Sequence, residues 1–179
     1  MSKRISWSEL DRLDRELVER AQEACGRAYA PYSLFAVGAA VRSKSGGIHT
    51  AANFENASYG LTICAEASAL SVANAAGDFA VEAIAVVGFG IRDAAGTSPV
   101  VTPCGSCRQI IAEAARLTDG DVRVLCCNGE LSSIILSTSS ELLPSAFGPD
   151  NLGPAAQWQL LRAELQARIE ELIAARRKL

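Results

Sequence analysis

The chain has 179 residues, of which 49% are hydrophobic and 21% are charged. This length and composition predict about one globular domain with a substantial buried core, and they exclude a disordered chain. The 17 Lys and Arg residues are outnumbered by 20 Asp and Glu residues, which gives a net charge of −3. A chain without a general excess of positive charge is not expected to bind a nucleic acid backbone.

No apolar run approaches the roughly 18 residues that a membrane-spanning helix needs, and no secretory signal follows the N-terminus. We therefore expect a cytoplasmic protein that binds no membrane. In a reducing compartment, cysteines are expected to be thiols or metal ligands rather than disulfides. The single histidine, His49, excludes a metal site built on several imidazoles of one chain.

The first expected element is an amphipathic helix over residues 6–28. Ser6 and Glu9 have the spacing of a capping box, and apolar residues then recur at steps of three and four. Pro31 ends this helix because proline restricts the residue before it and cannot continue a helix.

The middle of the chain alternates strands and helices. Strands are expected over residues 35–43, 47–54, 82–89, 121–127 and 133–137, and helices over residues 64–76 and 104–117. This order predicts an α/β fold, with a mixed five-stranded sheet in a three-layer α/β/α domain.

Residues 155–179 predict a C-terminal amphipathic helix, because apolar side chains recur on one helical face. These side chains are Trp158, Leu161, Leu165, Ile169 and Leu172. Gly-Pro breaks precede the helix, so we divide the chain into a main domain over residues 1–153 and a helical extension over residues 154–179. We expect the helix to pack on its own domain or on a sister subunit, since a polar face with both charge signs does not suit a membrane surface.

Two thiols lie three residues apart at the start of a predicted helix, in Pro103-Cys104-Gly105-Ser106-Cys107. Side chains at that spacing share a helical face, so both sulfurs can reach one ion. The helix N-terminus also favours thiolates, because its unsatisfied N–H groups form a positive end. The pair alone is half of a tetrahedral site, and a redox pair or a structural zinc site fits it as well.

Cys64-Ala65-Glu66 opens another predicted helix and supplies a third thiol. Three protein ligands leave the fourth position of zinc for water, which is typical of a catalytic rather than a structural site. A carboxylate two residues from a ligand is placed to move protons on and off that water. Zinc deaminases combine three cysteines, in one variant, with a non-ligating glutamate in this way.

Further motifs accompany the cysteines. They read Phe35-Ala36-Val37-Gly38, Asn53-Phe54-Glu55-Asn56-Ala57-Ser58-Tyr59, Cys104-Gly105-Ser106-Cys107-Arg108-Gln109 and Glu141-Leu142-Leu143-Pro144-Ser145-Ala146-Phe147-Gly148-Pro149. With the Cys64 motif and in this order, they resemble the cytidine deaminases of the homotetrameric, three-cysteine zinc type. The resemblance extends from about residue 15 to residue 152.

The resemblance implies a metal centre with one Zn²⁺ per subunit. Cys64, Cys104 and Cys107 would bind the ion, and Glu66 would be the catalytic proton shuttle.

The resemblance also implies a set of substrate-binding residues. They are Phe35, Asn53, Glu55, Ala57, Tyr59, Ala65 and Phe147. Asn53 and Glu55 would hold the ribose 3′-hydroxyl, which agrees with their spacing, since residues two apart on a strand point to the same face. Phe147 would come from a neighbouring subunit and cover the base, so that each site of a homotetramer is completed in trans.

The implied reaction is the zinc-dependent hydrolytic deamination of cytidine and 2′-deoxycytidine to uridine and 2′-deoxyuridine, with release of ammonia, as in pyrimidine salvage. The partner would be a small-molecule nucleoside. One alternative is a deaminase of a modified cytosine nucleoside, either N4-substituted or similar to blasticidin S. A second is a non-catalytic zinc module that binds a nucleoside or a protein, although such a module has no need of Glu66.

The sequence departs from the family pattern at Ala67. Cytidine deaminases of this type often carry arginine directly after the motif glutamate, where it hydrogen-bonds the zinc thiolates. Its absence is expected to weaken the zinc centre as a Lewis acid, unless another cation or the two helix N-termini offset the thiolate charge.

Overall fold

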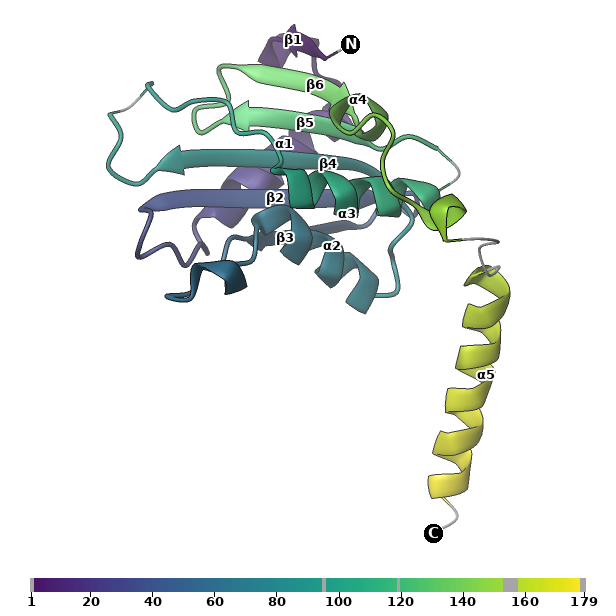
Figure 1. Ribbon diagram of the computed structural model, residues 1–179. Helices are drawn as coiled ribbons and strands as arrows, with labels where there is room; N and C mark the ends of the chain where they lie inside the picture. The colour runs from purple at the N-terminus through teal and green to yellow at the C-terminus, as the bar shows by residue number, and fades with distance from the viewer. Residues whose placement is uncertain (1, 95, 119, 153–157, 178–179) are drawn as a thin grey trace. The chain divides into compact units, whose positions relative to one another are not determined.

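A six-stranded sheet forms the middle layer of the main unit (Figure 1). Its strands lie in the order β1-β6-β5-β4-β2-β3, and only β4 and β5 pair in parallel. The strands are β1 (Lys3–Ile5), β2 (Phe35–Ser43), β3 (Ile48–Ala52), β4 (Val81–Gly90), β5 (Arg123–Asn128) and β6 (Ile134–Thr138). This computed structural model describes residues 2–94, 96–118, 120–152 and 158–177.

Helices cover both faces of the sheet, as the three-layer prediction requires. Helix α1 (Arg12–Cys25) packs on one face, and α2 (Ala65–Ala75) and α3 (Gly105–Arg116) pack on the other. The strand residues alternate accordingly: Val86 belongs to the core beneath α2 and α3, while Val87 belongs to the core beneath α1.

The close approach of α1 to the sheet depends on one glycine. A Cβ atom on Gly38 of β2 would lie 2.1 Å from the carbonyl oxygen of Ala21 and 2.6 Å from the backbone nitrogen of Cys25. Both atoms belong to the backbone of α1, so no side-chain movement could relieve the clash.

The predicted five-stranded sheet is wrong by one strand. Residues Lys3–Ile5 form β1, which pairs antiparallel with β6 at the edge of the sheet. A strand of three residues is too short to show the alternation on which a sequence prediction depends.

The expected helix over residues 6–28 is also corrected. The capping box exists, with the backbone N–H of Ser6 donating to Glu9 Oε2 at 2.7 Å, but it caps the N-terminus of a short 3₁₀ helix at Trp7–Glu9. Asp11 caps α1 instead, because its side chain accepts from the backbone N–H of Asp14 at 2.8 Å. The other predicted strands and helices of the main unit lie within two residues of their expected limits.

The contacts divide the chain into two units, Met1–Ala146 and Phe147–Leu179. The second unit contains the predicted C-terminal helix as α5 (Trp158–Arg176), whose apolar residues between Leu161 and Ile173 are about half exposed. The domain boundary predicted between residues 153 and 154 lies outside the described residues and stays a prediction. None of the described helices has both the length and the apolar content that crossing a bilayer requires.

A buried ion cluster ties α1 to the sheet far from any predicted site residue. The fully buried Asp14 accepts a hydrogen bond through Oδ1 from Arg42 Nη2 at 3.2 Å, and its Oδ2 lies 2.6 Å from Arg123 Nη2. Arg42 also donates through Nε to Glu82. Removing one member of such a cluster leaves buried charge uncompensated, which costs more than losing an exposed pair.

We therefore predict that Asp14→Asn lowers the free energy of unfolding by about 3 kcal/mol. Urea unfolding at a fixed protein concentration measures the change. Glu16→Gln is the matched control, because this side chain lies on the same helix and is 51% exposed. A loss below about 1 kcal/mol for Asp14→Asn would show that the cluster does not hold α1 in place.

Candidate metal centre and active site

Three cysteine thiols converge where two helices begin. Cys64 is the N-cap residue of α2, Cys104 is the N-cap residue of α3, and Cys107 lies in the first turn of α3. Their sulfur atoms all lie within 4.8 Å of one another, and Sγ of Cys64 is 3.9 Å from Sγ of Cys104. Two thiolates bound to one tetrahedral zinc at about 2.3 Å are about 3.8 Å apart, so these donors fit a zinc ion.

The three thiols differ in how readily they ionise. Burial raises the pKa of Cys64 and of Cys107, and the nearby charge of Glu66 raises both further. Burial also opposes ionisation of Cys104, but its pKa is lowered because backbone N–H groups of Cys107 and Ser106 stabilise the thiolate. The start of α3 and the neighbouring thiols therefore favour ionisation of Cys104, and a bound cation would favour ionisation of the other two.

Glu66 lies beside the thiols in the first turn of α2. Glu66 is only 4% exposed, and this burial raises the pKa of its carboxyl group. A hydrogen bond with the Cys107 side chain acts in the opposite direction and lowers that pKa. The buried carboxyl group and the three thiols all become negatively charged when they lose a proton, and they lie close together. Such an arrangement is costly without a cation, and a raised pKa suits a group that both accepts and returns protons.

Asn53 lies directly after β3, and the amide hydrogen-bonds to the neighbouring strand. Its Oδ1 accepts from the backbone N–H of Val37 at 2.9 Å, and its Nδ2 donates to the carbonyl oxygen of Phe35 at 3.0 Å. These bonds use one acceptor and one donor position of the amide, which has two of each. The Asn53 side chain therefore fixes the start of β2, and its remaining donor and acceptor positions stay available for a ligand.

Glu55 is held by the turn before β2. Its Oε2 accepts from the backbone N–H groups of Tyr32 at 2.9 Å and Ser33 at 3.3 Å. A hydrogen bond from the Ser33 side chain, with these backbone bonds, lowers the pKa of Glu55. The group is therefore a carboxylate at neutral pH, and its orientation is set before any ligand binds.

A short bridge places these polar residues beside the cysteines. Phe54, between Asn53 and Glu55, exchanges two backbone hydrogen bonds of 3.0 Å with Ile63. Ile63 directly precedes Cys64, so the segment with Asn53 and Glu55 runs next to the start of α2. The structure thus brings together the predicted metal ligands and the predicted ribose contacts.

The ring of Phe35 lies over β4 because position 88 is a glycine. A Cβ atom on Gly88 would lie 3.1 Å from Phe35 Cε1 and 2.8 Å from Val101 Cγ2. Sequence reasoning did not single out Gly88, since nothing in the linear pattern shows which strands are neighbours.

The remaining predicted site residues have different surroundings. Ala57 and Tyr59 are exposed, and Tyr59 contacts Tyr32 with ring centroids 6.0 Å apart. Ala65 is fully buried in the core beneath α2, so only its backbone can face a ligand. Phe147 is 58% exposed and belongs to the second unit.

Sequence reasoning also missed the contacts of Arg108, which directly follows Cys107. Its guanidinium donates through Nε to the carbonyl oxygen of Pro103 at 2.9 Å and through Nη1 to that of Leu142 at 3.1 Å. The residue was visible in the cysteine motif, but its second acceptor lies 34 residues away in the chain and could not be found from spacing.

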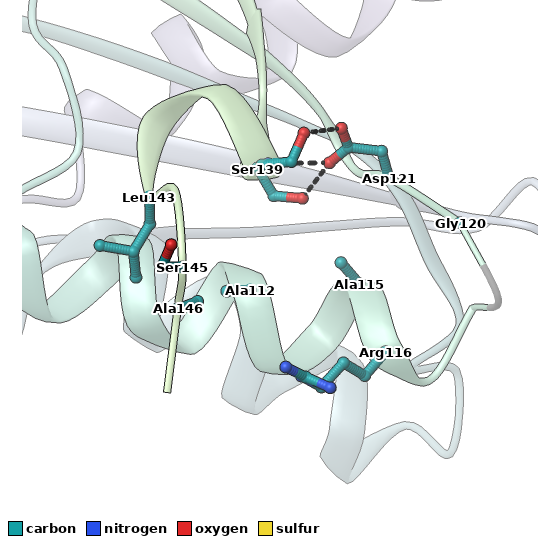
Figure 2. Close-up of a pocket in the computed structure, with 10 residues that line it drawn as sticks. Ala112, Ala115, Arg116, Gly120, Asp121, Ser139, Leu143, Ser145 and Ala146 are labelled. Atoms are coloured by element: carbon teal, nitrogen blue, oxygen red, sulfur yellow. Dashed lines mark hydrogen bonds between the residues drawn. The ribbon is translucent and has the colours of Figure 1, made fainter. Parts of the chain in front are cut away.

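A cavity of about 490 Å³ lies at the other end of α3 (Figure 2). Its lining residues come from α3, from the segment between α3 and β5, from α4 (Ser139–Leu142) and from the segment after α4. They include none of the predicted site residues. Asp121 closes one side of it, accepting hydrogen bonds from Ser139 and Ser140. The cavity is therefore separate from the metal centre.

Comparisons with known proteins agree with this geometry. The family model described as "Cytidine and deoxycytidylate deaminase zinc-binding region" matches residues 11–120. The chain is 46% identical over 143 residues to the cytidine deaminase of Halalkalibacterium halodurans, covering 78% of this chain and 98% of that relative. It is 38% identical over 135 residues to the cytidine deaminase of Mycobacterium tuberculosis, covering 74% and 87%.

Solved structures give the same result. The crystal structure of cytidine deaminase from Burkholderia pseudomallei has 41% identity and a TM-score of 0.64, covering 74% of this chain and 97% of that one. The structure from Mycobacterium leprae has 33% identity and a TM-score of 0.58, covering 76% and 100%. With its three converging thiols and these relatives, the chain belongs to the zinc-binding cytidine and deoxycytidylate deaminase family.

Proposed function

We propose that this chain catalyses the hydrolytic deamination of cytidine and 2′-deoxycytidine to uridine and 2′-deoxyuridine, with release of ammonia. The observation that carries the proposal is the convergence of three thiols beside the buried Glu66, in a chain 46% identical to a cytidine deaminase. The cofactor is zinc, and its ligands in this proposal are Cys64, Cys104 and Cys107. Three reduced thiols favour a reducing compartment, and we place the reaction in the cytoplasm.

When bound, zinc acts as a Lewis acid and lowers the pKa of a coordinated water to about 7. Glu66 takes the proton that the attacking water releases and delivers it to N3 of the base, which makes C4 more electrophilic. After attack at C4, Glu66 transfers the second proton of the water to the amino nitrogen, which leaves as ammonia. Its burial and raised pKa support this double role.

The nucleoside is held by residues around the start of β2. Glu55 accepts from the ribose 3′-hydroxyl with its preoriented carboxylate, and Asn53 contributes the amide positions that the strand leaves unused. Phe35 packs beside the ribose and base, and the backbone at Ala57 and Ala65 orients the ligand. Tyr59 completes the wall of the site near Tyr32.

Phe147 completes the site from a neighbouring subunit in this proposal. The ring is more than half exposed within one chain, which a trans contact would explain. We therefore propose a homotetramer as the active form.

The ligand assignment predicts that Cys104→Ala abolishes stoichiometric zinc binding. Elemental analysis of the purified wild-type protein is expected to give about one zinc per chain, and the variant far less, because two thiolates do not complete the three-ligand site. Cys25→Ala is the matched control, since this thiol lies in the core beneath α1. Full zinc content in Cys104→Ala would refute the assignment.

The proton-transfer role predicts that Glu66→Gln retains zinc and fold but lowers kcat for cytidine by about 10²- to 10⁴-fold. The amide has the size of the carboxyl group but cannot carry the proton. Turnover is followed by the absorbance change as cytidine becomes uridine. Glu113→Gln on the exposed side of α3 is the control. Near-normal kcat in Glu66→Gln would refute the proton-transfer role of Glu66.

The trans arrangement predicts that activity depends on assembly. Diluting the enzyme until light scattering reports single chains is expected to abolish deamination, and concentrating it again is expected to restore the rate. The physical reason is that a single chain lacks the aromatic side chain that a neighbour supplies. A monomer with the full rate per chain would contradict the proposal.

A further inference from the structure

Arg108 connects two parts of the chain that the proposed reaction uses. It follows Cys107 in α3, and its half-buried side chain turns back toward the N-terminus of the helix. Its first acceptor is the carbonyl oxygen of Pro103, the residue before Cys104. The guanidinium therefore holds Pro103, the residue before the N-cap of α3. We call residues 103–107, which carry Cys104 and Cys107, the metal loop.

The second acceptor of Arg108 lies at the end of α4. Leu142 is the last residue of this helix, and its carbonyl oxygen is one of those for which the helix itself supplies no partner. A planar guanidinium can donate in two fixed directions at once, which the single nitrogen of a lysine cannot reproduce. One side chain thus links the metal loop to a helix from another part of the sequence.

Residues 139–146 form the segment that Arg108 holds, and we call this segment the strap. Its start is fixed by Asp121, which accepts from the backbone N–H of Ser140 at 3.0 Å. Its later part runs beside α3 across the cavity of about 490 Å³, with Ser145 in the left-handed region at φ 56°. Packing against α3 is therefore interrupted there. The Arg108 bond at Leu142 is the attachment that joins the middle of the strap to α3, whereas the neighbouring Glu141 accepts from Ser137 Oγ at 3.0 Å.

We infer that Arg108 is a positioning residue that couples the metal loop to the strap and thereby fixes where Phe147 leaves the main unit. Phe147 is the residue directly after the strap. The kinetic part of this inference rests on the proposed function, in which Phe147 covers the base in a neighbouring site. A subunit's own metal loop would then orient the aromatic side chain that it supplies to its neighbour.

Three variants test this role: Arg108→Gln, Arg108→Lys and the control Glu113→Gln, which lies on the exposed side of the same helix. Hydrogen exchange of the zinc-loaded protein is measured at the backbone amides of residues 141–148. We expect exchange there to accelerate about tenfold in Arg108→Gln and less in Arg108→Lys, because the loss of a charge-assisted hydrogen bond has that order of magnitude. Glu113→Gln is expected to leave the exchange of these amides unchanged.

The kinetic measurement uses the same variants. The KM for cytidine is expected to rise about tenfold in Arg108→Gln while kcat changes less than about threefold and zinc content stays at one per chain, because Arg108 positions a binding group and transfers no proton. The KM of Arg108→Lys is expected to lie between those of the wild type and Arg108→Gln. If Arg108→Gln does not fold, the KM and the exchange rates of Arg108→Lys test the positioning role instead.

Unchanged exchange in both Arg108 variants would overturn the inference, and so would equal acceleration in Glu113→Gln. Faster exchange with an unchanged KM in an active enzyme would overturn the link to Phe147. A wild-type protein that does not deaminate cytidine would refute the proposed function instead, while the exchange measurement, which needs no turnover, would still decide whether Arg108 holds the strap.

Discussion

The convergence of three thiols and one buried carboxylate is the constraint on which the rest of the site depends. Four groups that lose protons lie together at the starts of two helices, where burial opposes their ionisation. A divalent cation removes this conflict, since it binds the thiolates and compensates the carboxylate. The N-terminus of α3 contributes as well, because its N–H groups help to lower the pKa of Cys104.

The fold supplies the geometry that this constraint requires. Helices α2 and α3 pack on the same face of the sheet, so that their N-terminal residues meet although they are 40 residues apart in sequence. The bridge between Phe54 and Ile63 then brings the ribose-binding candidates next to Cys64. The absence of arginine at position 67 leaves this centre without the neighbouring cation that relatives of its type often carry. Arg108 is a nearby cation, but it donates to the carbonyl oxygens of Pro103 and Leu142, and these hydrogen bonds serve positioning.

The sequence allows accurate prediction where a local pattern determines the structure. The cysteine spacing and the helix starts predict which thiols meet, and the order of strands and helices along the chain predicts the three layers. Contacts set by distant partners could not be predicted: β1 depends on pairing with β6, and Arg108 reaches a carbonyl group in α4. The capping box at Ser6 was predicted correctly as a local motif but was assigned to the wrong helix. It caps the N-terminus of a 3₁₀ helix just before α1, and α1 has its own cap.

The central claim is that one zinc ion is held by three sulfur atoms with a fourth position left for water. X-ray absorption at the zinc edge of the purified protein tests this claim directly, because it reports the type and distance of the atoms around the metal. We expect three sulfur atoms at about 2.3 Å and one oxygen atom at about 2.0 Å. Four sulfur atoms would describe a closed structural site and would contradict the proposed chemistry.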